Sequence, residues 1–242
     1  MKNFTLPRRP YNTVQVYKKS NIVINQGVTV LVGCNGAGKS TLLDIIKQQL
    51  KKDGIPCLSY DNMTDGRNKN QKCLEMGEIG KLAALTTCSE GEQIIIKMND
   101  YARAAVEFVK NKGEVELHGL ERLMARMMND EDEAEKKPPT EYWFILDAIG
   151  SGLSIDNIID LRKMFDKLCS IFPKDLTPYV IIAANDYEFC VDEQCFSVQD
   201  GKYVDIASYD DFKKFVIETR KYKENQYKKW AEKSQKRKAD DV

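Results

Sequence analysis

The sequence predicts an α/β fold with a mostly parallel central sheet flanked by helices, and three observations support this prediction. Val28–Val32, Tyr142–Leu146 and Tyr179–Ala184 are almost wholly apolar runs of β-forming residues, which is typical of strands buried on both faces. Segments with apolar residues at helical spacing alternate with these runs. A glycine-rich loop joins the first run directly to one such helix. This alternation is typical of a parallel sheet covered by helices.

The first half of the chain contains three expected strands before the glycine-rich loop and one after it. The β-rich runs Thr13–Tyr17 and Val28–Val32 enclose a shorter one at Ile22–Ile24. After the loop, apolar residues recur at helical spacing over residues 42–50, and Pro56–Tyr60 is the next expected strand. We expect a polar loop over Asp61–Gln71 and helices over residues 92–110 and 115–128.

The second half continues the alternation. Residues 129–140 are acidic and carry two prolines near their end, which predicts a solvated, mobile loop. The strand Tyr142–Leu146 ends on Asp147, and apolar residues over 161–172 predict a helix before the strand Tyr179–Ala184. We expect Cys195–Val198 and Lys202–Val204 to pair as a hairpin that turns at Asp200–Gly201.

Composition excludes several classes of protein. With 242 residues, 42% of them hydrophobic, the chain can bury the core of one large or two small domains, which excludes disorder of the whole chain. No apolar run reaches the roughly 18 to 20 residues of a membrane-spanning helix, and the N-terminal residues lack the apolar core of a secretory signal. The seven cysteines form no C-x-x-C pair, so reduced thiols are expected. We therefore expect a cytoplasmic protein with no membrane partner. The single histidine, His118, excludes a histidine-rich metal site.

The balanced charge of 37 basic and 37 acidic residues hides an asymmetry. Residues 213–238 contain eleven basic and three acidic residues, a charge of +8, which with two further acidic residues leaves −6 on residues 1–212. Aromatic residues lie among the lysines at Tyr222, Tyr227 and Trp230. Three interpretations stay open: a nucleic-acid contact in which lysines neutralise phosphates and rings stack on bases, a solvated C-terminal helix, and a contact with an acidic segment or partner.

The glycine-rich loop, residues 33–40, reads Gly-Cys-Asn-Gly-Ala-Gly-Lys-Ser and fits the pattern G-x-x-x-x-G-K-[ST] between a buried strand and a helix. Backbone N–H groups in such a loop point at phosphates, assisted by the positive end of the helix. Lys39 would reach the β- and γ-phosphates, and Ser40 would bind Mg²⁺. We therefore expect a P-loop nucleoside-triphosphatase domain over residues 1–212, followed by a basic helix or tail over 213–242. The expected nucleotide-binding residues are Gly33, Asn35, Gly36, Ala37, Gly38, Lys39, Ser40 and Thr41.

The second half of such a site is an acidic residue at the end of a neighbouring strand, where it holds Mg²⁺. Asp147 closes the strand Tyr142–Leu146 and is the candidate. The alternative is that Asp147 only caps the end of the strand.

Two further motifs follow in a fixed order. Cys88–Gln93 reads C-S-E-G-E-Q and opens a helix, and Ser151–Ser154 reads S-G-L-S after Asp147. A P-loop, a Ser-x-Gly signature at a helix start, a strand ending in Asp and an S-G-L-S loop, in this order, resemble the ATP-binding-cassette ATPases. The resemblance covers about residues 13–205.

In that family two subunits face each other head to tail, with ATP clamped between the P-loop of one and the signature of the other. The resemblance implies ATP and Mg²⁺ as cofactors and a homodimer or larger even oligomer. It also implies that Ser89, Gly91 and Glu92 contact the nucleotide of a partner subunit. Ser89 and Glu92 also fit a capping box at the start of the helix. The capping box could be their whole role, or both roles could hold, since such a helix must be capped in any case.

The spacing of the motifs indicates a branch of the family. Ser89 follows Lys39 by 50 residues, which leaves little room for the subdomain by which transporter cassettes dock on membrane subunits. The chain is more similar to the soluble cassettes of the structural-maintenance-of-chromosomes, RecF and overcoming-lysogenization type and to small cassettes beside phage-defence genes. This implies a switch in DNA repair, nucleic-acid sensing or anti-phage defence, with an effector protein from a neighbouring gene. A hydrolysis-deficient scaffold or regulatory subunit stays open, and a transporter subunit is disfavoured.

Two departures from the family pattern predict slow hydrolysis. The residue after the strand-ending aspartate is normally a glutamate that activates water, and here it is Ala148. A histidine normally follows the next strand, and here Asn185 takes that place, where it can hydrogen-bond a phosphate or orient water. Loss of a general base costs about 10²- to 10⁴-fold in rate. The open alternatives for that base are Asp156, Asp186 and Glu188.

Two further roles are assigned by the resemblance. Gln71 is the candidate for the glutamine that positions water beside the metal, and Asp65 and Arg67 are equally placed alternatives. Tyr11 or Tyr17 would stack on adenine, unless these rings belong to the core.

Overall fold

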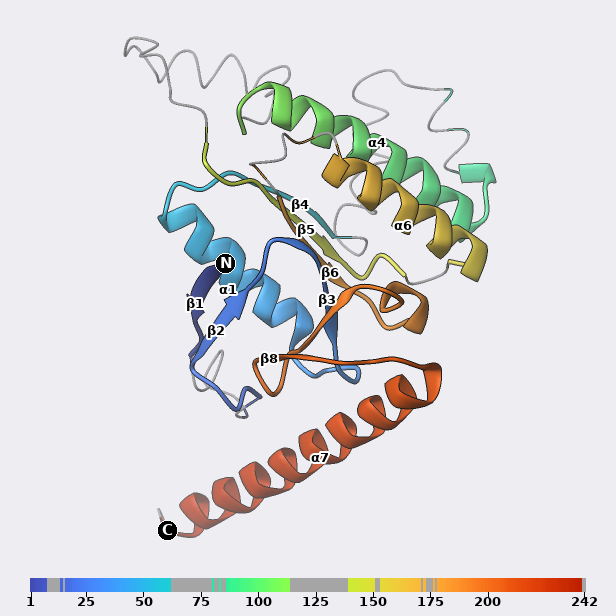
Figure 1. Cartoon of the computed structure of the whole chain (residues 1–242). Coiled ribbons are helices and arrows are strands. Elements are labelled where there is room, and N and C mark those ends of the chain that lie inside the picture. The colour runs from blue at the N-terminus through green and yellow to red at the C-terminus, as the bar shows by residue number, and fades with distance from the viewer. Residues whose placement is uncertain are drawn as a thin grey trace.

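The chain folds around a six-stranded sheet flanked by helices (Figure 1). The computed structural model describes residues 1–7, 14, 16–61, 80, 83, 86–113, 139–150, 153–170, 172, 176 and 178–240, without the side chains of residues 90, 91, 94, 95, 97 and 233–240. In order across the sheet, the strands are β4 (Cys57–Asp61), β5 (Trp143–Asp147), β6 (Tyr179–Ala183), β3 (Gly27–Val32), β7 (Gln194–Ser197) and β8 (Lys202–Val204). The first five are parallel, and β8 runs antiparallel to β7. The predicted α/β fold with a mostly parallel sheet flanked by helices is confirmed.

Helices cover both faces of the sheet because the central strands are apolar on both sides. On β5, Trp143 and Ile145 pack toward α1 (Lys39–Lys52), whereas Phe144 and Leu146 pack toward the opposite layer. That layer consists of α4 (Glu90–Lys110) and α6 (Ile155–Ser170), and all four side chains are at most 1% exposed. The expectation of strands buried on both faces is therefore confirmed.

A second, two-stranded sheet covers the outer side of α1. It pairs β1 (Lys2–Thr5) with β2 (Asn21–Ile24) in antiparallel register and buries Phe4 and Ile24 against the α1 layer. The strand predicted over Thr13–Tyr17 is wrong where it can be compared, because the described residues 14, 16 and 17 belong to no strand. The edge of β2 is occupied by Lys2–Thr5 instead, a run too short and too polar to stand out in the sequence.

The remaining expectations divide between confirmed elements and segments outside the description. The helix after the glycine-rich loop, the strand near residues 57–61, the helix over 92–110 and the hairpin at Asp200–Gly201 are all present. The loop over 62–71, the helix over 115–128, the acidic residues 129–138 and His118 lie outside the described residues. The six cysteines that are described are free thiols. None of the described helices is long and apolar enough to cross a membrane.

The sheet topology brings three loops to one edge. Strands β3, β5 and β6 are parallel, so their carboxyl ends meet there, and β6 lies between the other two. The loops that leave them begin at Gly33, Ala148 and Ala184. Ligands of open α/β sheets bind beyond the carboxyl ends of the strands. The helix α7 (Tyr209–Asp240) begins beside this edge and runs past it toward the C-terminus (Figure 1).

Candidate functional site

The glycine-rich loop, residues 33–40, connects β3 to α1 by a turn that depends on glycine. Gly38 has φ +92°, and a Cβ there would lie 2.9 Å from Val16 Cγ1. The Tyr17 hydroxyl donates to the Gly38 carbonyl at 3.0 Å. The left-handed backbone and the close packing therefore both require glycine at this position.

The first turn of α1 is open to an anion. Its N-cap residue is Gly38, which has no side chain to accept a hydrogen bond from the helix. The first N–H groups of any helix have no partner within the helix, and the positive end of the helix dipole lies at the same place. The start of α1, at Lys39, Ser40 and Thr41, is therefore suited to hold phosphate oxygens.

The Lys39 ammonium lies inside the loop. It donates to the Gly33 carbonyl at 2.9 Å and approaches the Cys34 carbonyl at 3.4 Å. Burial lowers the pKa of Lys39, the nearby carboxylate of Asp147 acts in the opposite direction, and the charge of Lys223 on α7 adds a smaller lowering effect. The two hydrogen-bond partners of the Lys39 ammonium are neutral carbonyls, so an arriving phosphate would offer it a stronger, charged acceptor.

Ser40 and Asp147 form the second part of the site. The Ser40 hydroxyl hydrogen-bonds the Asp147 carboxylate across the carboxyl edge of the sheet. Burial raises the pKa of Asp147, and the nearby charge of Asp61 raises it further against the effect of Ser40. Asp61 ends β4 directly opposite Asp147 in the strand register. Sequence reasoning missed Asp61 because it was assigned to the following loop, although an acid closing a strand was the same signal that identified Asp147.

This pair fits Mg²⁺ rather than a metal that needs a closed protein cage. Hydroxyl and carboxylate oxygens are ligands that Mg²⁺ takes, usually one or two from the protein together with water and substrate phosphates. Within the described residues, no group of three or more His, Cys, Asp and Glu side chains could hold a metal alone. Gln71, the third expected metal-site residue, lies outside the described residues.

The raised pKa of Asp147 predicts that Asp147→Asn stabilises the protein without ligand. The folded state binds the Asp147 proton more tightly than the unfolded state, so ionisation of this group lowers stability as pH rises above the unfolded pKa. The neutral amide removes that effect. We expect a higher melting temperature for Asp147→Asn at about pH 8 and a smaller difference at about pH 4. A lower melting temperature at about pH 8 would contradict this assignment, and thermal denaturation followed by circular dichroism measures both.

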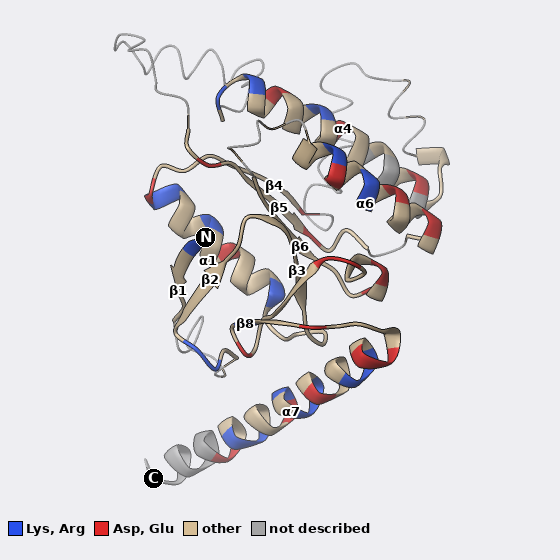
Figure 2. Cartoon of the chain, viewed as in Figure 1, with Lys and Arg blue, Asp and Glu red and all other residues tan. Residues whose placement is uncertain are grey.

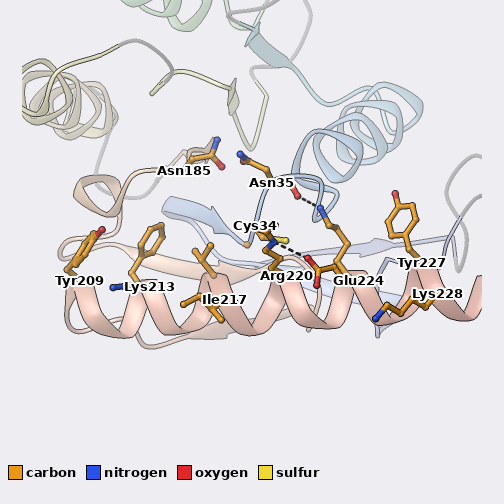
Figure 3. Close-up of a pocket in the computed structure, with 14 residues that line it drawn as sticks. Cys34, Asn35, Asn185, Tyr209, Lys213, Ile217, Arg220, Glu224, Tyr227 and Lys228 are labelled. Atoms are coloured by element: carbon orange, nitrogen blue, oxygen red, sulfur yellow. Dashed lines mark hydrogen bonds and ion pairs between the residues drawn. The ribbon is translucent and has the colours of Figure 1, made fainter.

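Asn185 lies at the same edge and faces a cleft beside the glycine-rich loop. The cleft has a volume of about 1000 Å³ and is lined by Gly33, Cys34, Asn35 and Asn185 on one side. Side chains of α7 line the other side (Figure 3). The structure therefore brings Asn185 to the glycine-rich loop, as its position after β6 predicts.

Ala148 occupies a strained position next to Asp147. Its φ is +53°, a left-handed conformation that costs a non-glycine residue roughly 1–2 kcal/mol. Its N–H donates to the Ala183 carbonyl at 3.2 Å, which fixes the turn after β5 to β6. The Ala148 side chain has no group that can accept a proton.

Asp186 and Asp156, two of the three candidates for the missing base, differ in their surroundings. A side chain at Gly150 would meet the Asp186 carboxylate, so Asp186 lies at the turn that follows Asp147. Burial raises the pKa of Asp186, and Glu188 raises it further. By contrast, a hydrogen bond from Ser154 lowers the pKa of Asp156. Asp186 has the properties expected of a proton acceptor, and Asp156 does not.

The start of α4 carries a complete capping box. The Ser89 hydroxyl accepts from the Glu92 N–H at 3.4 Å, and the Glu92 carboxylate accepts from the Ser89 N–H at 2.8 Å. Hydrogen bonds from Ser89 lower the pKa of Glu92. The predicted capping box is therefore confirmed, and Gly91 lies in the first turn of the helix. Any phosphate contact at Ser89 requires the Glu92 carboxylate to move, because the phosphate and the carboxylate are both anions and repel each other.

Of the two tyrosines proposed for adenine, Tyr17 is within the described residues, and its ring is not presented to a ligand. Tyr17 is 2% exposed and belongs to the core layer around α1, which favours the alternative that its ring is structural. Tyr11 lies outside the described residues.

The basic C-terminal segment is part of a helix that contacts the site. Both signs of charge alternate along the described part of α7 (Figure 2). Its Lys213, Arg220, Lys223 and Lys228 line the cleft beside the glycine-rich loop. Sequence reasoning missed this contact, since nothing local marks a residue that meets a loop 188 positions earlier in the chain.

Comparison with known proteins adds no assignment. A scan against protein-family models finds no match, and a search of curated proteins finds none either. The function is therefore argued from the geometry of the site and from the motifs in the sequence.

Proposed function

We propose that this protein is an ATP-binding protein of the ATP-binding-cassette type, which binds MgATP in the glycine-rich loop and acts as a nucleotide-dependent switch. The observation that carries the proposal is the meeting of three groups at one edge of a parallel sheet. These groups are the uncapped start of α1, the buried Lys39 ammonium and the Ser40–Asp147 pair. In the proposal they hold, in that order, the phosphate oxygens, the β- and γ-phosphates and the Mg²⁺ ion.

The proposed switch is a head-to-tail dimer that encloses ATP. In Figure 1 the start of α4 lies apart from the glycine-rich loop of the same chain. This separation supports the proposal that Ser89 meets a nucleotide carried by a second copy rather than its own. When ATP is bound between two copies, the Ser89 hydroxyl would give up its hydrogen bond to the Glu92 carboxylate and donate to the γ-phosphate instead.

Hydrolysis is proposed to be slow, because Ala148 stands where a base is expected. A protein of this kind keeps the ATP-bound dimer long enough to engage an effector, which we propose to come from a neighbouring gene and to act in DNA repair, nucleic-acid sensing or anti-phage defence. The second candidate is a hydrolysis-deficient scaffold. The lack of a base at Ala148 supports this candidate as well as it supports a slow switch.

Light scattering coupled to size exclusion tests the dimer. We expect the 27.7 kDa chain to double in mass with MgATP and to remain a monomer with MgADP. Ser89→Asp is the sharpest variant, since aspartate still caps α4 but places a negative charge against the incoming phosphate. It should bind ATP as a monomer and fail to dimerise.

A mixture of two variants tests the head-to-tail arrangement. We expect neither Ser89→Asp nor Lys39→Met to dimerise alone. A dimer of one copy of each has one intact site, in which the glycine-rich loop of the Ser89→Asp copy faces Ser89 of the Lys39→Met copy. We expect partial recovery of dimer in the mixture. Wild-type protein that binds MgATP and stays monomeric would refute the dimer while leaving the nucleotide site in place.

A further inference from the structure

The helix α7 is fixed to the first half of the glycine-rich loop by two hydrogen bonds. The Thr219 hydroxyl accepts from the Cys34 N–H at 3.1 Å, and the Lys223 ammonium donates to the Asn35 carbonyl at 2.7 Å. Thr219 is 5% exposed, and its carbonyl accepts from the buried Gln199 amide at 3.0 Å. This part of α7 is therefore anchored to the body at Thr219, one helical turn before Lys223.

These contacts leave the phosphate-binding part of the loop free. They use Cys34 and Asn35, whereas the open N–H groups lie at the start of α1, from Lys39 onward. The Lys223 ammonium also lies 3.2 Å from the place where a Cβ of Gly36 would be. Lys223 therefore lies against Asn35 and Gly36, in the middle of the glycine-rich loop.

Lys223 faces the same end of the loop as Lys39. Burial is the main cause that lowers the pKa of Lys39, the Asp147 carboxylate opposes it, and the charge of Lys223 is close enough to add a smaller lowering effect. Two ammonium groups that repel each other across a loop of neutral carbonyls are stabilised when an anion lies between them. Lys39 is the residue expected at the β- and γ-phosphates, so Lys223 lies at that end of a triphosphate.

The cleft around Lys223 carries an excess of positive charge. Lys213, Arg220, Lys223 and Lys228 line it, with Glu224 as the carboxylate among the α7 residues of the lining. Glu224 is already paired with Arg220 at 3.0 Å. The cleft has a volume of about 1000 Å³, at the upper end of the range for small-molecule sites, and it adjoins the glycine-rich loop at Gly33, Cys34 and Asn35.

We infer that Lys223 is a second phosphate-binding lysine, which contacts the terminal phosphate of a nucleoside triphosphate held in the glycine-rich loop of the same chain. The inference rests on the proposed function, namely that this loop binds MgATP. On binding, the ammonium turns from the neutral Asn35 carbonyl to a charged phosphate oxygen, which attracts it more strongly. The C-terminal helix then belongs to the nucleotide site and distinguishes a triphosphate from a diphosphate.

Isothermal titration of the full chain with MgATP, MgADP and inorganic triphosphate tests the inference. Lys223→Met should weaken binding of ATP and of inorganic triphosphate by about tenfold or more, and binding of ADP by less than about threefold. Lys223→Arg should recover most of the loss. Lys221→Met is the matched control, because Lys221 is exposed on the same helix two residues away, and it should bind all three ligands like the wild type.

The ratio of ATP to ADP affinity separates a phosphate contact from a structural role. Loss of helix packing alone would weaken the binding of ATP and ADP equally. An unchanged ratio of ATP to ADP affinity in Lys223→Met therefore overturns the inference. Tighter ATP binding in Lys223→Met also overturns it, since Lys223 would then hold the loop against the ligand. If wild type and Lys221→Met bind neither nucleotide, the proposed function fails as well. If both bind ATP and Lys223→Met binds it equally well, only the inference fails.

Discussion

Replacing Ala148 with glutamate should raise the rate of ATP hydrolysis by about 10²- to 10⁴-fold. The expected gain is large because the rest of the proposed machinery lies at the same edge of the sheet, with Ser40 hydrogen-bonded to Asp147 and Asn185 in the adjoining cleft. Ala148 follows Asp147 directly, so a carboxylate there is placed next to the metal site. Release of inorganic phosphate under single-turnover conditions measures the change.

Two variants at the same position show whether the new carboxylate is the cause. Ala148→Gln has nearly the same size as glutamate but accepts no proton, and it should remain as slow as the wild type. Ala148→Gly relieves the left-handed φ of +53° and should stabilise the protein by about 1 kcal/mol without a gain in rate. A gain in rate with glutamine or glycine would show that relief of strain, not base catalysis, had limited the wild type.

We expect any residual hydrolysis of the wild type to depend on Asp186. Its carboxylate lies at Gly150, within the turn that follows Asp147, and burial raises its pKa. Asp186→Asn should remove the residual rate in the wild-type background and have little effect once Ala148→Glu supplies a base. Equal losses in both backgrounds would assign Asp186 a structural role at the turn.

Local patterns in the sequence predict the centre of the fold, and long-range contacts explain what was missed. Val28–Val32 and Tyr142–Leu146 were identified because a strand buried on both faces is apolar at every position. β1 was missed because Phe4 alone among its four residues is buried, so the strand shows no run and no clear alternation. Pairing with β2, not its own composition, makes it a strand.

The same distinction holds within the candidate site. Lys39, Ser40 and Asp147 follow from a contiguous motif and from the end of an apolar strand, both of which are visible in the sequence. Lys223 and Thr219 follow from the packing of a helix against a loop more than 180 residues earlier in the chain. An excess of lysine near the C-terminus therefore indicated charge but not the surface that the charge faces.

Replacing Lys39 with methionine should weaken MgATP binding by about 10- to 150-fold, which corresponds to the loss of a hydrogen bond between charged groups. Methionine keeps the length of the side chain and a similar helix propensity, so α1 should still form. In the empty protein it removes a buried ammonium, and the Gly33 carbonyl loses its 2.9 Å partner. We expect these two effects to offset each other in part, so that the melting temperature without ligand changes less than the affinity.

The matched control for Lys39→Met is Lys51→Met, an exposed position in the last turn of the same helix. It should bind MgATP like the wild type, because the positive end of α1 and the Ser40–Asp147 pair are untouched. Titration of both variants with MgATP measures the difference. If Lys39→Met binds MgATP as tightly as Lys51→Met, phosphate is not held by this loop. The cluster of cations on α7 would then be the remaining anion site of the cleft, and it would have to bind its ligand without the start of α1.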